Sequence, residues 1–248
     1  MLVKKIIMKY LKSYHLFEII NIPLWPEREG NNNWGFPAMD WCQAIQDYQL
    51  VKKWNIGDYK GSWFKGKDGH VIFFHLNDLN YRWLDEPENS TVKWEIKLPE
   101  NYKEILQRGF EKYKLGVAIL KVSLEDYQDG LKVKVAGSNT KLIEELGIKG
   151  SAFNLYKSFV KETKKPIFSD TAQTAASRNA IWKKLVNDPQ CEVVGYDQKS
   201  GKEFDIEEKN GEFVISGNQP IYFGLTSSSQ KNDKRRHRTR ILKLKSVE

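Results

Sequence analysis

The segment that most constrains the fold spans residues 166–185, where a short apolar strand leads directly into a helix. Ile167 and Phe168 form the expected strand, and residues 169–171 (Ser-Asp-Thr) supply the polar side chains that begin helices. Upstream, the glycine-rich residues 147–152 open another helix, expected over 153–161. The second helix carries apolar residues at helical spacing: Ala176, Ala180, Ile181 and Leu185. A helix, a strand and a helix in this order predict a mixed α/β core.

Length and composition limit the class of protein. The chain has 248 residues, of which 40% are hydrophobic, which is enough for one large domain or two small ones. We expect no membrane-spanning helix, because no apolar run approaches about 20 residues, and we expect no signal peptide at the N-terminus. Cys42 and Cys191 lie far apart in the sequence and are expected to be free thiols, which favours a reducing cytoplasm.

The net charge of +8 suits nucleic acid, acidic proteins or a phosphorylated cofactor, although solubility alone also explains it. The strongest basic run lies near the C-terminus, within residues 227–245. It predicts either a nucleic-acid-binding arm or a final strand with a basic face. We favour a strand over 238–245 after a loop at 227–236. The candidate nucleic-acid contacts are Lys234, Arg235, Arg236 and Arg238.

Aromatic residues set the N-terminal part apart, since seven of the eight tryptophans fall in the first hundred residues. These aromatic rings could stack on exposed bases while the interleaved lysines contact phosphates. The interpretation that we favour is that most of the tryptophans are buried against a sheet. Here we expect a strand at 16–23, an irregular loop at 25–40, and a helix over 41–53 with Asp40 as its N-cap.

Alternating and glycine-flanked segments predict the remaining elements. A hairpin is expected from 61–65 and 70–76, and its odd spacing places His70 and His75 on opposite faces. With four histidines and no zinc-binding spacing, we predict no metal site. The other expected elements are a helix at 102–113 and strands at 92–98, 116–122, 131–135, 191–196, 203–206, 212–215 and 221–225.

The order of elements over residues 115–225 resembles the Gcn5-related N-acetyltransferase (GNAT) family. In that family the loop before the first helix reads Gln/Arg-x-x-Gly-x-Gly/Ala. Gly150 and Ala152 match its last two positions, whereas Gly147 stands where the Gln or Arg belongs. The resemblance implies that backbone N–H groups at this helix start hold the pyrophosphate of acetyl-CoA. The implied cofactor-binding residues are Lys149, Gly150, Ser151 and Ala152.

A second motif resembles a group of phage- and prophage-encoded GNAT-like proteins. Its matching residues are Ser169, Asp170, Gln173, Thr174, Ser177, Trp182 and Leu185. GNAT enzymes commonly use a tyrosine on the last helix as a general acid, and Trp182 stands in that place here. An indole cannot supply a proton at neutral pH, so Trp182 is expected in the core. Tyr156 and Tyr196 are the candidate replacements, and candidate general bases are Asp40, His75, Glu125 and Asp126.

The sequence thus predicts an α+β fold with a mixed, mostly antiparallel twisted sheet flanked by helices. We expect a single domain over 1–248, with an aromatic-rich N-terminal elaboration (1–99), a GNAT-like core (100–226) and a basic C-terminal loop and strand (227–248). The expected activity is N-acyl transfer from acetyl-CoA or another acyl-CoA to a nucleic acid or protein. The alternative is an inactive GNAT-like fold that binds nucleic acid or other phage proteins. We expect it in the cytoplasm, which would be the host's for a phage product, or in the virion, and not in a membrane.

Overall fold

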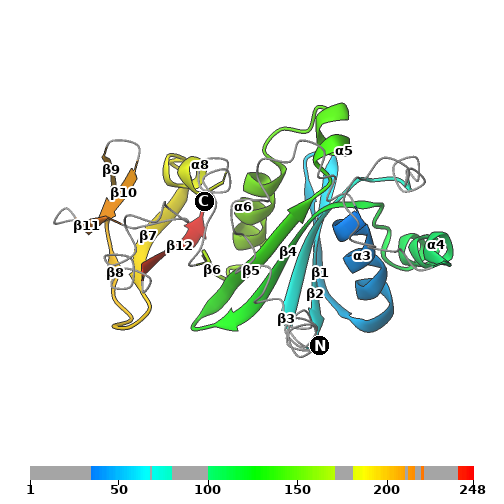
Figure 1. The fold of residues 1–248 in the computed structure, drawn as a ribbon, viewed down its shortest axis with the longest axis horizontal. Coiled ribbons are helices and arrows are strands. Elements are labelled where there is room, and N and C mark those ends of the chain that lie inside the picture. The colour runs from blue at the N-terminus through cyan, green and yellow to red at the C-terminus, as the bar shows by residue number, and fades with distance from the viewer. Residues whose placement is uncertain are drawn as a thin grey trace, which may run out of the picture. The chain divides into compact units, whose positions relative to one another are not determined.

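The computed structural model describes residues 35–67, 69–79, 100–170, 181–209, 212–215, 219–220 and 240–248 (Figure 1). The chain forms two compact units. The first comprises Met1–Leu124 and Lys134–Lys149, and the second comprises Glu125–Val133 and Gly150–Glu248. These boundaries differ from the divisions expected after residues 99 and 226, and the grouping into a single domain stays a prediction.

The first unit combines an antiparallel meander with helices. Each strand in the meander pairs with the next in the chain, and β3 pairs antiparallel with β4. The elements in chain order are α3 (Gly35–Asp47), β1 (Gln49–Ile56), β2 (Tyr59–Gly66), β3 (Gly69–His75), α4 (Tyr102–Tyr113), β4 (Ala118–Tyr127), β5 (Gly130–Ser138) and α5 (Thr140–Glu145). The turn between β4 and β5 belongs to the second unit, so these two strands run through both units.

Helices α3 and α4 share one core with the sheet (Figure 1). The Trp41 ring meets the rings of Phe64 and Phe73 edge-on, with centroids 5.3 and 5.4 Å apart. The two helices touch where Gly109 of α4 faces Ile45 of α3, because a Cβ at Gly109 would lie 2.4 Å from the Ile45 side chain. This close approach explains a glycine in the middle of a helix, where glycine is otherwise unfavourable. Trp41 is buried in this core, and Trp54 and Trp63 are buried outside it, so all three of these tryptophans are buried as we expected.

The predictions around Asp40 were wrong. Helix α3 begins at Gly35, so residues 35–40 are not a loop and Asp40 lies inside the helix. Pro37 is compatible with this start, because the first turn of a helix has N–H groups without intrahelical partners. The helix ends at Asp47, and residues expected to continue it form β1. Pairing of β1 with β2 along its length overrides the helical spacing of the sequence.

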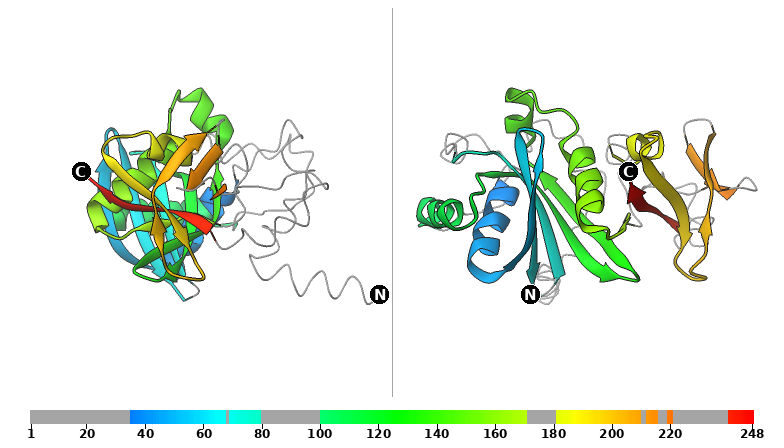
Figure 2. Two further views of the ribbon diagram at one scale, coloured as in Figure 1. Left: turned by 90° about the vertical axis from the view of Figure 1, so that its left-hand side faces the viewer. Right: turned by 180° about the vertical axis from the view of Figure 1, so that it is seen from behind.

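The second unit is built on a sheet whose strands lie side by side in the order β5, β6, β12, β7 and β8. Only the first residues of β5, up to Val133, belong to this unit. β5 and β6 are parallel, whereas β12 runs antiparallel to both of its neighbours. Figure 2 shows β12, in red, beside β7, in yellow. A smaller antiparallel sheet has the order β11-β10-β9. The elements are α6 (Ser151–Thr163), β6 (Ile167–Phe168), α8 (Lys183–Val186), β7 (Cys191–Asp197), β8 (Glu203–Phe204), β9 (Ile206–Lys209), β10 (Glu212–Ile215), β11 (Gln219–Pro220) and β12 (Arg240–Val247).

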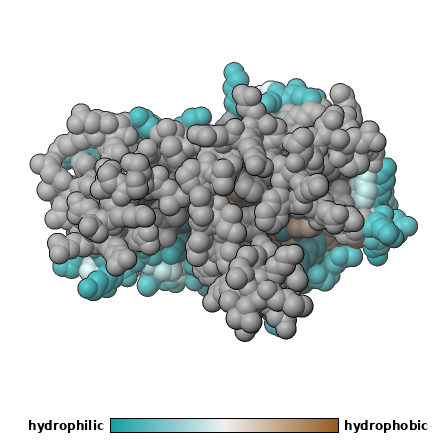
Figure 3. Space-filling model, viewed as in Figure 1, coloured by the Kyte–Doolittle hydropathy of each residue, from teal (hydrophilic) through white to brown (hydrophobic). Residues whose placement is uncertain are grey.

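Much of the expected architecture is confirmed. The fold is α+β with a mixed, mostly antiparallel sheet. The helix at 102–113, the hairpin and the C-terminal strand are all present. The expected segments at 16–23, 92–98, 221–225 and 227–236 lie outside the described residues. Within the described part of the chain, no helix is long and apolar enough to cross a membrane. The described residues on the face in Figure 3 are mostly hydrophilic. Among all described residues, the large apolar side chains that are exposed are Val51 and Leu146.

Candidate functional site

The start of α6 is the place where the sequence predicts a ligand. Gly150 precedes the helix with φ 67° and ψ 29°, a left-handed conformation that favours glycine. The first helical bond runs from the Asn154 N–H to the Gly150 carbonyl, at 2.8 Å. Because Gly150 has no side chain, the cap residue itself offers no acceptor to the first N–H groups of the helix.

This helix start has a favourable potential for an anion. A Cβ built on Gly150 would be in ordinary van der Waals contact with the Asn154 and Phe153 side chains, at 3.8 and 4.0 Å, so neither side chain clashes with it. Ser151 is buried and Ala152 is half-buried. The three predicted residues Gly150, Ser151 and Ala152 therefore lie together in one turn, whose N–H groups and helix dipole attract negative charge. The fourth predicted residue, Lys149, is exposed and precedes them as the last residue of the first unit.

Tyr156, a candidate general acid, lies on α6 with its ring against Trp182, at a centroid distance of 5.9 Å. Trp182 is buried, as expected for a core residue. Tyr156 is also buried, and burial together with the nearby Asp170 carboxylate raises its pKa. A phenol with a raised pKa holds its proton more firmly than a free tyrosine does. Its catalytic role stays a prediction.

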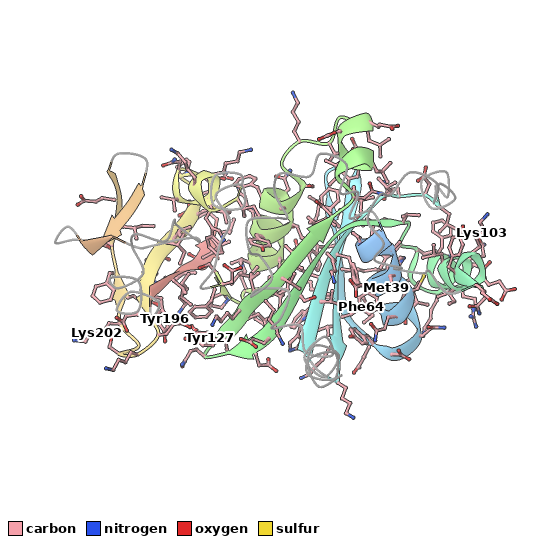
Figure 4. The ribbon with its side chains drawn as sticks, viewed as in Figure 1. Met39, Phe64, Lys103, Tyr127, Tyr196 and Lys202 are labelled. Atoms are coloured by element: carbon pink, nitrogen blue, oxygen red, sulfur yellow. The ribbon has the colours of Figure 1, made fainter. Side chains whose placement is uncertain are left out.

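Tyr196, the other candidate, lies on β7 in a different aromatic group (Figure 4). Its ring is 5.1 Å from that of Phe168 and 6.3 Å from that of Tyr127, edge-on in both cases. The Tyr196 ring therefore belongs to an aromatic cluster, whereas the Tyr156 ring packs against Trp182. The role of Tyr196 in catalysis also stays a prediction. The nucleic-acid contacts predicted at Lys234, Arg235, Arg236 and Arg238 lie outside the described residues.

A serine–histidine pair in the first unit resembles the geometry of a nucleophile and its base. His75 Nδ1 lies 3.1 Å from the Gly116 carbonyl, and its Nε2 lies 2.7 Å from the Ser62 hydroxyl. Because a carbonyl only accepts, Nδ1 donates and Nε2 accepts from Ser62. Both side chains are fully buried, and burial lowers the pKa of His75 to about 3. An imidazole of such low basicity, closed to solvent, is a structural hydrogen-bond partner rather than the general base that we considered.

Asp40 has a partner that sequence reasoning missed. Its carboxylate forms a buried ion pair with Lys121 of β4, and burial raises the pKa of Asp40 although the Lys121 charge opposes this. Ser62, Phe73 and Lys121 are cross-strand neighbours, so they share the sheet face against which Trp41 of α3 packs. The signal for this pair was a lysine between apolar residues in the first half of the strand Ala118–Tyr127. Charged residues in such positions are rarely buried without a partner.

The described residues contain no cluster of three or more histidine, cysteine, aspartate or glutamate side chains that could hold a metal ion. His70 accepts a hydrogen bond from the Trp63 indole at 3.0 Å, whereas His75 contacts Ser62. Because Ser62 and Trp63 are adjacent in β2, the two histidines lie on opposite faces of the sheet, as expected. In the part of the chain that the structure covers, Cys42 and Cys191 are free thiols, as expected.

Comparisons with models of known protein families, with curated proteins and with solved structures find no match.

Proposed function

We propose that this chain is an acyl-CoA-dependent N-acyltransferase with a GNAT-like fold, and that the start of α6 holds the cofactor's pyrophosphate. The observation that carries the proposal is the left-handed Gly150, which precedes a helix whose first N–H groups donate no hydrogen bond to a cap side chain. Such a turn binds anionic groups without needing a basic side chain. The pyrophosphate of acetyl-CoA is the anion that the family resemblance implies.

The strand arrangement of the second unit supports the same proposal. β5 and β6 are parallel, with Leu131 opposite Ile167 and Lys132 opposite Phe168, and α6 lies in the connection between them. Parallel neighbours require such a crossover. The acceptor in this proposal is a nucleic acid or a protein, in keeping with the net charge of +8.

A second candidate function is a non-catalytic, phage-type binding protein that retains the fold. The observation that favours it is the burial of Tyr156, whose raised pKa makes it a weak proton donor, next to the buried Trp182. In this case the basic residues would bind nucleic acid or other phage proteins.

Calorimetric titration with acetyl-CoA and with CoA tests the proposal on the wild type and on Gly150→Glu. The glutamate adds bulk and negative charge where the pyrophosphate is proposed to bind. Gly57→Glu is a matched control, because Gly57 also has a positive φ of 57° and has no atom within 4 Å of a built Cβ. We expect micromolar binding by the wild type and the control, and loss of binding in Gly150→Glu.

Absence of binding by the wild type overturns the acyltransferase proposal. Salt-dependent binding of DNA and RNA would then test the second candidate, because phosphate contacts weaken steeply as salt rises. If both Gly150→Glu and Gly57→Glu lose acetyl-CoA binding equally, the loss comes from backbone strain and not from a blocked anion site. If binding holds, phenylalanine replacements of Tyr156 and Tyr196 test the two candidate acids once an acceptor has been found.

A further inference from the structure

The side chain of Lys243, in the sheet of the second unit, is buried, although lysine is normally exposed. Lys243 stands near the middle of β12, directly opposite Phe168 of β6 and Val194 of β7. Only 7% of its side chain is exposed. A charge in such a place is stable only if the surrounding groups replace the water that it loses.

Aromatic rings provide part of this replacement. The Lys243 Nζ lies 5.0 Å from the centroid of the Phe168 ring and 5.8 Å from that of Tyr196. Both distances are within the range of about 6 Å over which a ring face attracts a cation. The Phe168 and Tyr196 rings meet at 71° and Tyr127 packs edge-on against Phe168 at 74°, so the three rings hold one another in place.

Two carboxylates complete the surroundings of the ammonium. Asp129 Oδ2, from the turn between β4 and β5, and Glu203 Oε1, from β8, each lie 2.9 Å from Nζ. Burial lowers the pKa of Lys243, but the hydrogen bonds to Asp129 and Glu203 outweigh this and leave it raised. The lysine is therefore charged at neutral pH, and its charge is satisfied by groups from separate segments.

The neighbouring lysines have their own partners. Lys245 pairs with Glu192 at 2.7 Å and with the other oxygen of Glu203 at 3.2 Å. Lys132 lies over the Tyr127 ring, at 5.2 Å, and donates to Gln198 at 3.0 Å. Glu203 is thus shared between Lys243 and Lys245, whereas Asp129 and the rings of Phe168 and Tyr196 contact Lys243.

We propose that Phe168, Tyr196, Asp129 and Glu203 form a binding site for a primary alkylammonium ion, and that Lys243 is its internal ligand. The four residues come from β6, β7, the β4–β5 turn and β8, and they meet one charge on β12. A one-residue slip of β12 would point Lys243 to the other face of the sheet, so occupation of the site fixes the register of this strand. The proposal is independent of acyl-CoA binding.

Chemical rescue tests the proposal. In the full-length Lys243→Ala variant, the missing atoms correspond to n-propylammonium. We expect n-propylammonium chloride to raise the unfolding temperature of this variant, and the increase should level off as its concentration rises. The increase should exceed that caused by the same concentration of sodium chloride. A gain of 1 kcal/mol shifts the midpoint of a protein of this size by roughly 2–4 °C. The wild type, whose site is filled, should not respond.

Lys245→Ala is the matched control, because Lys245 pairs with carboxylates at a more exposed position, where 32% of its side chain is accessible. An equal response of both variants, or an equal response to n-propanol, overturns the proposal. If Lys243→Ala does not fold, a double-mutant cycle of Lys243→Met with Glu203→Gln gives a second measurement. The cycle should show that the effects are not additive, and additive effects would overturn the proposal.

Discussion

The carboxylate of Asp40 on α3 and the ammonium of Lys121 on β4 form an ion pair in the interior of the first unit, with 10% and 5% of their side chains exposed. Taking two charges out of water is expensive, and their attraction offsets this cost only while both are present. The pair therefore makes the docking of α3 on the sheet depend on two residues far apart in the sequence.

Replacing Lys121 by methionine should destabilise the protein by about 3–5 kcal/mol, because it leaves the buried Asp40 carboxylate uncompensated. Urea denaturation measures the loss. The double variant Asp40→Asn, Lys121→Met should recover much of the stability, since neither charge remains. A cost below about 1 kcal/mol for the single variant, typical of exposed pairs, would contradict the buried geometry.

Stability should fall in acid because His75 is held neutral. Its folded pKa is lowered to about 3 from an ordinary value of 6.5. Between these values the unfolded chain binds a proton that the folded protein does not, so the contribution of His75 is complete above pH 6.5 and declines as the pH falls towards 3. At about 1.4 kcal/mol per pH unit, roughly 3 kcal/mol is lost between pH 6.5 and pH 4. Urea midpoints should show a shallower pH dependence in His75→Gln, and an unchanged slope would refute this assignment.

Gly116→Ala should be strongly destabilising. A Cβ at Gly116 would lie 2.1 Å from the Asp78 carbonyl oxygen and 2.4 Å from that of Leu76, and backbone atoms cannot easily move aside. We expect a loss of about 3 kcal/mol or more, at the upper end for overpacked sites. Gly57→Ala, with open space at its Cβ but a left-handed backbone, should lose only about 1 kcal/mol from strain. Thermal unfolding compares the two, and similar losses would contradict the close backbone approach at Gly116.

Two lysines from the sheet should hold the end of α4. Lys53 Nζ donates to the Tyr113 carbonyl and Lys60 Nζ to the Lys114 carbonyl, both at 2.8 Å. Cations at a helix C-terminus contribute about 0.3–1 kcal/mol each. In Lys53→Met, Lys60→Met, hydrogen exchange of the last turn of α4 should accelerate several-fold, whereas exchange in α6 should not change. Uniform acceleration across the protein would indicate global destabilisation instead.

Local signals in the sequence predicted the elements that depend on local physics. The helix at 102–113 has a clear apolar stripe, and the hairpin between β2 and β3 has glycines at its turn. The turn at Gly150 was predicted for the same reason. Asp40 was misread because an aspartate before an apolar stripe also fits an N-cap. Its true partner, Lys121, depends on how α3 docks on the sheet, which no local pattern encodes.

Pairing between distant segments explains the other contacts that the sequence did not predict. Ser62 meets His75 because β2 and β3 pair in one register and the Gly116 carbonyl lies beside the imidazole. The site around Lys243 needs four segments to converge, and its sequence shows only a basic residue in an alternating strand. By contrast, the strand over 238–245 was predictable, because its alternation of apolar and basic residues extends over several positions.

The position of β12 between β6 and β7 has a consequence for synthesis on the ribosome. β1, β2 and β3 follow one another directly, so the nascent chain can close this meander early. β6 and β7 must instead wait, each with an unpaired edge, until residues 240–247 emerge from the exit tunnel. Unpaired edges recruit other strands. In the interval before β12 arrives, these two edges are therefore open to pairing with strands of other chains.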